Sequence, residues 1–294
     1  MKKFASIVLL VSSLTAMAAD RTIYDLMYLP NAGTVYGFSD FSLVDGRAEG
    51  EVIGEDYDVN ISGYNFEQTV GYSVTDTFSV QLDMNYASTK QKVDLNDALN
   101  SFGNEDTEGK TKGLSDPSLT FKYRALEDGL IIDVGAGVTV KTGDNEIDDE
   151  ERDNKQGGNS FLLAGQVGQK MESFQWAFIS KFERYMKSTV DTKGEGKVKD
   201  DAHNEWTFGG EILNKLDENM FLRSTLGVAF SDGYDDDEDD KTPPVTQYVI
   251  GTEFQYLFSQ NLLGRVGIQY VKQNQSPFDT FQYMTFNVGA TYQF

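Results

Sequence analysis

Apolar and polar residues alternate without a break along the end of the chain, residues 280–294. The apolar and aromatic set is Met284, Phe286, Val288, Ala290, Tyr292 and Phe294. The residues between them are small or polar. A β-strand with lipid on one face and water on the other needs about 9–11 residues of this kind. Strands of soluble proteins rarely alternate for so long, and chain ends usually fray. This stretch therefore predicts a membrane-spanning β-strand.

The same alternation recurs in pairs of segments that short turns join. The predicted turns are residues 75–76, 126–129, 172–173, 216–218 and 259–260. Longer polar connections separate the pairs, near residues 88–113, 142–158, 187–203, 231–243 and 273–279. Short periplasmic turns and long outer loops are typical of transmembrane β-barrels. We predict an all-β, antiparallel, up-and-down barrel of about twelve strands. An even strand number places both termini on the periplasmic side and lets the last strand pair with the first.

The beginning of the chain is less regular. Residues 20–33 show no period, and we place them as a periplasmic N-terminal segment at the barrel mouth, with the barrel itself spanning residues 34–294. Within the first strand the outward apolar set shifts from Tyr36 and Phe38 to Phe41, which predicts a β-bulge.

Two features of the chain ends indicate export and membrane assembly. Lys2 and Lys3, a short apolar run and small residues predict a signal peptide, residues 1–19, that is cleaved on export. The ending on Tyr292 and Phe294 resembles the assembly signal of outer-membrane β-barrels, which implies the barrel-assembly machinery as a partner. A soluble sandwich or a lipocalin-like barrel would explain the alternation, but not these features together. We therefore predict the outer membrane of a Gram-negative bacterium.

Composition narrows the possible partners and chemistry. The hydrophobic content of 39% and the mean hydropathy of −0.43 suit a barrel, because only alternate residues meet lipid. A formal net charge of −22 argues against nucleic acid, since phosphate binding requires a basic surface. The chain has no cysteine, which excludes disulfides, thiol catalysis and thiolate metal sites.

The positions opposite the outward apolar set carry charges of both signs. They are Glu67, Asp83, Lys122, Arg124, Asp133, Lys141, Lys181, Glu183, Glu211, Arg223, Glu253 and Arg265. Twelve strands would enclose a lumen narrower than that of porins with about 16–18 strands. The charges either line a narrow polar pore or pair across neighbouring strands and fill the interior. Their mixture argues against an anion-selective pore.

Two predicted loops, within residues 144–153 and 232–240, are strongly acidic. Clustered carboxylates suit Ca²⁺ or Mg²⁺, which would bridge the loops to lipopolysaccharide phosphates. The candidate ligands are Asp235, Asp236, Asp237, Asp239 and Asp240. Neither loop has the spacing of a calcium-binding loop, and a solvated, self-repelling loop is the simpler interpretation. No other metal or cofactor is predicted.

Catalysis is not expected. Barrel enzymes such as outer-membrane phospholipases and proteases use histidine as a base. The single histidine, His203, lies at the start of a predicted strand and has no nucleophile motif near it.

Two neighbouring segments resemble one known family. Residues 113–116 (Gly-Leu-Ser-Asp) lead into Lys122-Tyr123-Arg124, and residues 137–144 end in Lys-Thr-Gly-Asp. This pair is similar to the motifs of the outer-membrane proteins named for the meta-cleavage pathway of phenol degradation. Ser115 and Lys141 depart from the family pattern, which has Gly and Pro there. The resemblance implies a channel for small solutes, aromatic or apolar ones among them.

The prediction is therefore an outer-membrane channel for passive uptake or efflux of small solutes, with outer-membrane lipid and lipopolysaccharide around it. A nucleoside-type channel with twelve strands is the nearest alternative within transport. A structural or surface-interaction barrel with a plugged lumen and cation-binding acidic loops is the alternative from another class.

Overall fold

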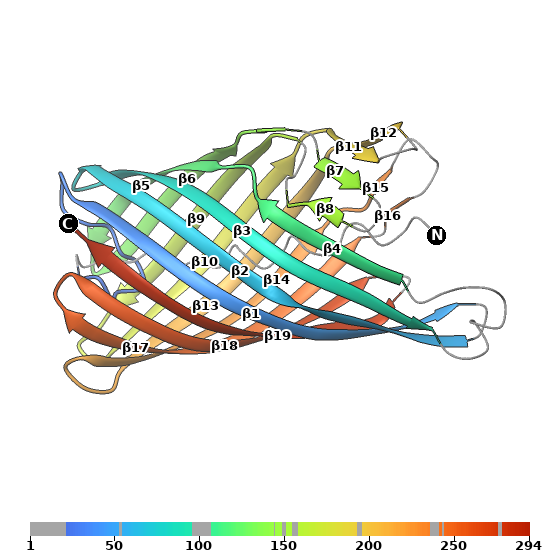
Figure 1. Cartoon of the computed structure of the whole chain (residues 1–294). Helices are drawn as coiled ribbons and strands as arrows, with labels where there is room; N and C mark the ends of the chain where they lie inside the picture. Colours follow the sequence, from blue (N-terminus) through green and yellow to red (C-terminus); the bar gives the residue numbers. More distant parts are fainter. Residues whose placement is uncertain are drawn as a thin grey trace.

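The structure, a computed structural model, describes residues 22–52, 55–95, 107–143, 145–148, 151–154, 158–192, 196–235, 241–242, 244–275 and 278–294. In these residues twelve long strands form one closed antiparallel barrel (Figure 1). They are β1 (Val35–Val52), β2 (Glu55–Thr75), β3 (Phe78–Leu95), β5 (Ser118–Asp128), β6 (Leu130–Thr139), β9 (Ser160–Lys170), β10 (Phe174–Tyr185), β13 (His203–Lys215), β14 (Met220–Ser231), β17 (Val245–Ser259), β18 (Leu262–Gln275) and β19 (Phe278–Gln293). The predicted fold class and strand number are confirmed.

The final strand closes the barrel as its alternation predicted. β19 pairs antiparallel with β18 on one side and with β1 on the other, where Tyr36 lies opposite Gln293. Its outward residues Phe286 and Val288 are 48% and 45% exposed, whereas inward Thr285 is fully buried. The closed sheet has no free edge, so backbone groups of the wall find partners within it.

The five predicted turns all join neighbouring strands at one end of the barrel, where the C-terminus also lies (Figure 1). Gly129, which forms the turn between β5 and β6, has φ near +70°, a conformation that glycine adopts without strain.

At the opposite end several strands are longer than predicted. β3 continues to Leu95, and β4 (Thr107–Leu114) begins again inside the predicted loop of residues 88–113. Glu108 forms ion pairs there with Lys90 at 2.5 Å and Lys110 at 3.1 Å. Here the outward face of β3 is polar, whereas inward Val93 packs in an apolar cluster with residues of β1, β2, β17, β18 and β19. The apolar-outward alternation therefore no longer marks the strand, although backbone pairing continues.

Short strands occupy the other predicted loops. They are β7 (Asn145–Asp148), β8 (Glu151–Asp153), β11 (Ser188–Thr192), β12 (Gly196–Asp200), β15 (Tyr234–Asp235) and β16 (Lys241–Thr242). β8 pairs in parallel with β4, and β7 pairs in parallel with β11. All the other strand pairs are antiparallel.

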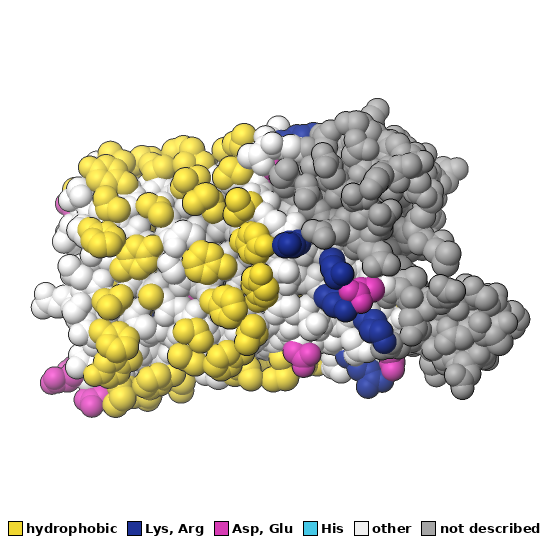
Figure 2. All heavy atoms as spheres, in the orientation of Figure 1, with side chains coloured by type: hydrophobic (Ala, Val, Ile, Leu, Met, Phe, Trp, Pro, Cys, Tyr) yellow, Lys and Arg dark blue, Asp and Glu magenta, His cyan; other side chains and the backbone are white. Residues whose placement is uncertain are grey.

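The outer surface carries a broad apolar band. Figure 2 shows apolar side chains spread over the part of the barrel near the short turns, with Lys, Arg, Asp and Glu side chains along the border towards the long loops. Leu226, Ile250 and Phe258 are between 57% and 65% exposed. Large apolar side chains exposed around a whole barrel are suited to lipid contact. The described residues contain no helix long and apolar enough to cross a bilayer.

The predicted bulge in β1 is wrong. The register of β1 with β2 is continuous, and Tyr36 and Phe38 point inward while Phe41 points outward and is 40% exposed. The two inward aromatic rings contact the ring of Tyr28, with centroids 5.7 and 6.4 Å away. An apolar partner inside the barrel therefore explains apolar residues on the lumen face.

Candidate functional site in the barrel lumen

The N-terminal segment, residues 22–33, lies inside the barrel at the end with the short turns (Figure 1). Its buried side chains are Ile23, Leu26, Met27, Tyr28 and Leu29, each 4% exposed or less. The first four of these form one apolar cluster with inward residues of β1, β6, β10, β13, β14 and β18. Because these strands lie around the whole wall, the segment crosses the lumen and occupies this end of it.

Polar groups of the wall bind the backbone of this segment. The carbonyl oxygens of residues 26–28 accept hydrogen bonds in turn from Gln166 Nε2 at 3.5 Å, Arg124 Nη2 at 2.6 Å and Lys122 Nζ at 3.0 Å. Asp133 joins the two cations, with 2.9 Å to Lys122 Nζ and 2.9 Å to Arg124 Nε. These three charged side chains are at most 3% exposed, so their ion pairs and hydrogen bonds offset the cost of burial.

Asp25 fixes the start of the segment. Its carboxylate forms an ion pair with Lys170 at 2.9 Å and accepts hydrogen bonds from Thr22 and Gln175. Burial raises the pKa of the Asp25 carboxyl to about 6, against the opposing influence of Lys170.

A second charged network lines another part of the wall. Arg223 contacts Glu211 at 2.5 Å and Glu253 at 3.7 Å, and Arg265 contacts Asp40 at 2.5 Å. The side chains of both arginines are at most 11% exposed. This network links β1, β13, β14, β17 and β18 across the lumen face.

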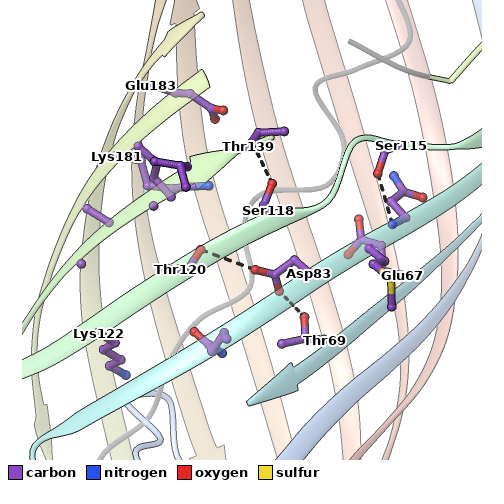
Figure 3. A pocket seen from close by; sticks show the side chains of 18 of the residues that line it. Glu67, Thr69, Asp83, Ser115, Ser118, Thr120, Lys122, Thr139, Lys181 and Glu183 are labelled. Carbon is purple, nitrogen blue, oxygen red and sulfur yellow. Dashed lines mark hydrogen bonds between the residues drawn. The ribbon is translucent and has the colours of Figure 1, made fainter. Parts of the chain in front are cut away.

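Between these networks lies a lumen cavity of about 270 Å³ (Figure 3). On one side Asp83 accepts hydrogen bonds from Thr69 at 2.5 Å and Thr120 at 3.5 Å. Figure 3 shows Lys181 and Glu183 on the other side of the cavity. Ionised and hydroxyl side chains thus face an aqueous space inside the barrel.

The wall between these two sides is smooth. Gly135, Gly137 and Ala164, on β6 and β9, line the cavity there and leave room that larger side chains would fill. The Lys181 ammonium attracts the carboxylates of Glu67, Asp83 and Glu205.

A smaller cavity of about 110 Å³ lies beside the second network, lined by Arg223, Glu253, Arg265 and Asp40. Glu67 lines both cavities, so the two spaces adjoin at this side chain. Together they form a polar space in the middle of the barrel.

The structure divides the sequence-predicted lumen residues into three groups. Lys122 and Arg124 bind the N-terminal segment, and Asp133 forms ion pairs with both of them. Glu211, Arg223, Glu253 and Arg265 form the second network. Glu67, Asp83, Lys181 and Glu183 line the larger cavity, whereas Lys141 lies just beyond the end of β6.

The predicted lumen residues omit three cavity carboxylates: Asp116, which the family motif includes, and two inward residues of the strands, Asp40 and Glu205. Asp40 was overlooked because the assumed bulge obscured the phase of β1; counting back from outward Phe41 would have found it. Glu205 has the same inward phase as Glu211 on β13, and the alternation that begins at Trp206 carries that signal.

The two motif segments of the family resemblance meet at one rim of the barrel. Asp116 Oδ1 accepts hydrogen bonds from the backbone N–H and the hydroxyl of Thr142, both at 2.7 Å. Pro117 O accepts a hydrogen bond from Val140 N at 3.0 Å. Asp116 is therefore a structural link between β5 and the end of β6 as well as a cavity-lining residue.

The remaining predicted residues lie apart from the cavities. The Tyr292 hydroxyl is 2.6 Å from Gln68 Nε2 at the seam of the barrel, and Phe294 is 82% exposed. His203 stacks on Tyr185 with ring centroids 4.6 Å apart. Asp236, Asp237, Asp239 and Asp240 lie outside the described residues, and only the strand position of Asp235 is described.

The fold and lumen define the chain as an outer-membrane-type β-barrel. The structure is similar to the COG4313 outer membrane channel from Pseudomonas putida F1, with TM-score 0.61, 16% identity, and coverage of 94% of this chain and 98% of that one. The CymD monoaromatic hydrocarbon channel gives TM-score 0.39 and 10% identity, with 90% and 89% covered. The NanC porin has a TM-score of 0.48 and 8% identity, with coverage of 86% of this chain and 98% of that one.

At these identities the likeness shows the fold alone. No protein-family model and no curated protein sequence matches the chain.

Proposed function

We propose that this protein is a passive channel for small solutes in the outer membrane of a Gram-negative bacterium. The observation that carries the proposal is the pair of adjoining polar cavities inside a closed barrel, lined by ionised and hydroxyl side chains. A barrel with only a structural role would be more stable with a lumen filled by apolar side chains or paired charges. The apolar outer band and the fold shared with an outer-membrane channel support this location.

The N-terminal segment supports the alternative, a barrel whose lumen is plugged. It crosses the short-turn end and is held there by Arg124 and Lys122. For a channel, this segment narrows the route at that end, so we expect small conductance and slow passage rather than a wide pore.

Polar lining favours small water-soluble solutes. The aromatic or apolar solute class, and membership of the phenol meta-pathway family, rest on the motif segments around Asp116 and Thr142. CymD is a channel for monoaromatic hydrocarbons, and that solute class belongs to CymD. The solute class therefore stays a proposal that a transport screen must decide.

Export and assembly complete the proposal. Residues 1–19 would be removed, and Tyr292 and Phe294 would present the aromatic ending to the assembly machinery. Phe294 is exposed beside the seam, where such contact is accessible. Ca²⁺ or Mg²⁺ held by the acidic loops, and lipopolysaccharide bridged by it, remain part of the proposal.

The test is single-channel recording of the refolded chain, without its signal peptide, in a planar bilayer. A shift in gel mobility on heating shows that the barrel is folded. We expect small, stable openings that prefer cations, followed by uptake of small polar solutes into proteoliposomes. A folded barrel that passes neither ions nor solutes would overturn the channel and favour the structural role.

A further inference from the structure

Glu67 occupies the junction of the two lumen cavities. Its strand register places Asp40 of β1 opposite it on one side and Asn85 of β3 on the other. The side chain lines both cavities, and Figure 3 shows it near Asp83 on the wall of the larger one. Glu67 is therefore the side chain at which the two cavities adjoin.

Two carboxylates, on the neighbouring strands β1 and β3, lie close to Glu67. Asp40 and Asp83 both repel its carboxylate. Asp40 is engaged by Arg265 at 2.5 Å, and Asp83 by two threonine hydroxyls. In the described part of the chain, the one side-chain hydrogen bond to Glu67 comes from Asn65 Nδ2 at 3.3 Å. Lys181 attracts Glu67 but also two further carboxylates, Asp83 and Glu205, so Glu67 shares this cation with them.

Two amide oxygens beside Glu67 lack donors. Asn65 is 9% exposed and lines the smaller cavity, and its Oδ1 has no hydrogen-bond partner among the described residues. Asn85 lines the larger cavity, and its Oδ1, which is also buried, likewise has no hydrogen-bond partner among the described residues. Buried acceptors are nearly always satisfied by a donor, a water or a bound ion. Two such oxygens flanking a carboxylate point to a positively charged ligand.

We propose that Glu67, Asn65 and Asn85 form a binding site for a monovalent cation, either an alkali ion or the ammonium group of a small amine. When a bound cation holds Glu67 in its ionised form, the carboxylate and two neutral oxygens supply about one negative charge, whereas hard divalent ions require several carboxylates. The described residues contain no group of three or more metal-ligating acidic, histidine or cysteine side chains. The inference deepens the proposed channel function, because it assigns the residue that selects the permeating ion.

The first test is the reversal potential of single channels in a KCl gradient. Glu67→Gln preserves the shape of the side chain and removes its charge, and we expect the cation-to-anion permeability ratio to fall by about threefold or more. Glu218→Gln is the matched control, because Glu218 lies on an exposed turn and lines neither cavity. An unchanged ratio in a folded, conducting E67Q channel would overturn the site while leaving the channel intact.

The second test measures binding without conduction. Thermal unfolding in detergent is compared in equal concentrations of sodium, methylammonium and tetraethylammonium chloride. We expect sodium or methylammonium to raise the unfolding temperature relative to the bulky ion, because a ligand of the native state stabilises it, and E67Q to abolish the difference. Sodium alone would identify an alkali-ion site, and methylammonium alone an amine site. Equal unfolding temperatures in all three salts would overturn the proposal, even for a barrel that is silent in bilayers.

Discussion

Two groups of inward charged side chains in this barrel differ in how many hydrogen bonds and ion pairs the protein supplies to them. At the short-turn end, Lys122, Arg124 and Asp133 bind one another and two carbonyl groups of the N-terminal segment. At mid-barrel, Glu67 has one long hydrogen bond and faces two cavities. Both clusters consist of charged residues on the inner face of the same wall.

The difference shows that an inward charge in a barrel has no fixed role. The chain itself supplies the partners of the first cluster, so these residues stabilise the closed end. At Glu67 the described residues supply one side-chain hydrogen bond, from Asn65, so its carboxyl group faces the two cavities and remains available to ions and solutes. The two interpretations left open by the sequence, a charged pore and a paired interior, therefore apply to different levels of one lumen.

Removing Arg124 should have the largest effect. Arg124→Ala leaves Asp133 with one cation and frees the carbonyl of Met27, both in a buried setting. We expect the free energy of unfolding, measured by urea titration in lipid vesicles, to fall by about 3–5 kcal/mol. Arg47→Ala removes an exposed ion pair with Asp58 and should cost less than about 1 kcal/mol. Similar losses of unfolding free energy in the two variants would show that the buried cluster stabilises the barrel no more than an exposed ion pair does.

Packing at the closed end gives a smaller effect. A methyl group added at Gly71 would overlap the ring of Tyr36, which packs on the N-terminal segment. Gly71→Ala should destabilise the barrel by about 1–3 kcal/mol in the same urea titration. Gly165→Ala, where an added methyl meets nothing within 4 Å, should change stability little. Equal stability of the two alanine variants would contradict tight packing of the first strand on the segment.

The smallest expected effect is the pH dependence of the closed end. Since burial raises the pKa of Asp25 from 3.8 to about 6, its protonation favours the docked segment. This stabilisation is complete below pH 3.8 and is lost as the pH rises through 6. Lowering the pH from 7 to 5 should stabilise the chain by about 1 kcal/mol relative to Asp25→Asn. The same pH dependence of stability in the native chain and in Asp25→Asn would show that protonation of Asp25 does not stabilise the closed end.

The sequence predicted the barrel wall well, because alternation between lipid and water is imposed residue by residue. The phase of β19, the five turns and the twelve strands follow from it. Alternation did not predict the structure correctly where a strand does not have lipid on one face and water on the other. Outside the lipid, β3 and β4 continue as strands without the apolar outward face, and in β1 the aromatic Tyr36 faces a segment of the chain rather than water.

The candidate site was less predictable for the same reason. Phase alone identified inward charges such as Arg124 and Glu67, but it carries no information about their partners. One partner of Arg124, the carbonyl group of Met27, belongs to a segment without any period. The incomplete hydrogen bonding of Asn65 depends on neighbouring strands, which no local pattern specifies.

The central claim is that the middle of the lumen is open to water while its short-turn end is closed. The absence of native cysteine allows this to be measured with single introduced thiols. Ser118 lines the larger cavity, and Leu29 of the N-terminal segment is fully buried. In the folded barrel, a small cationic methanethiosulfonate reagent should modify the thiol of Ser118→Cys rapidly and that of Leu29→Cys slowly, and an anionic analogue should react more slowly with the former. Protection of both thiols would contradict the open lumen, and rapid modification of both would contradict the closed end.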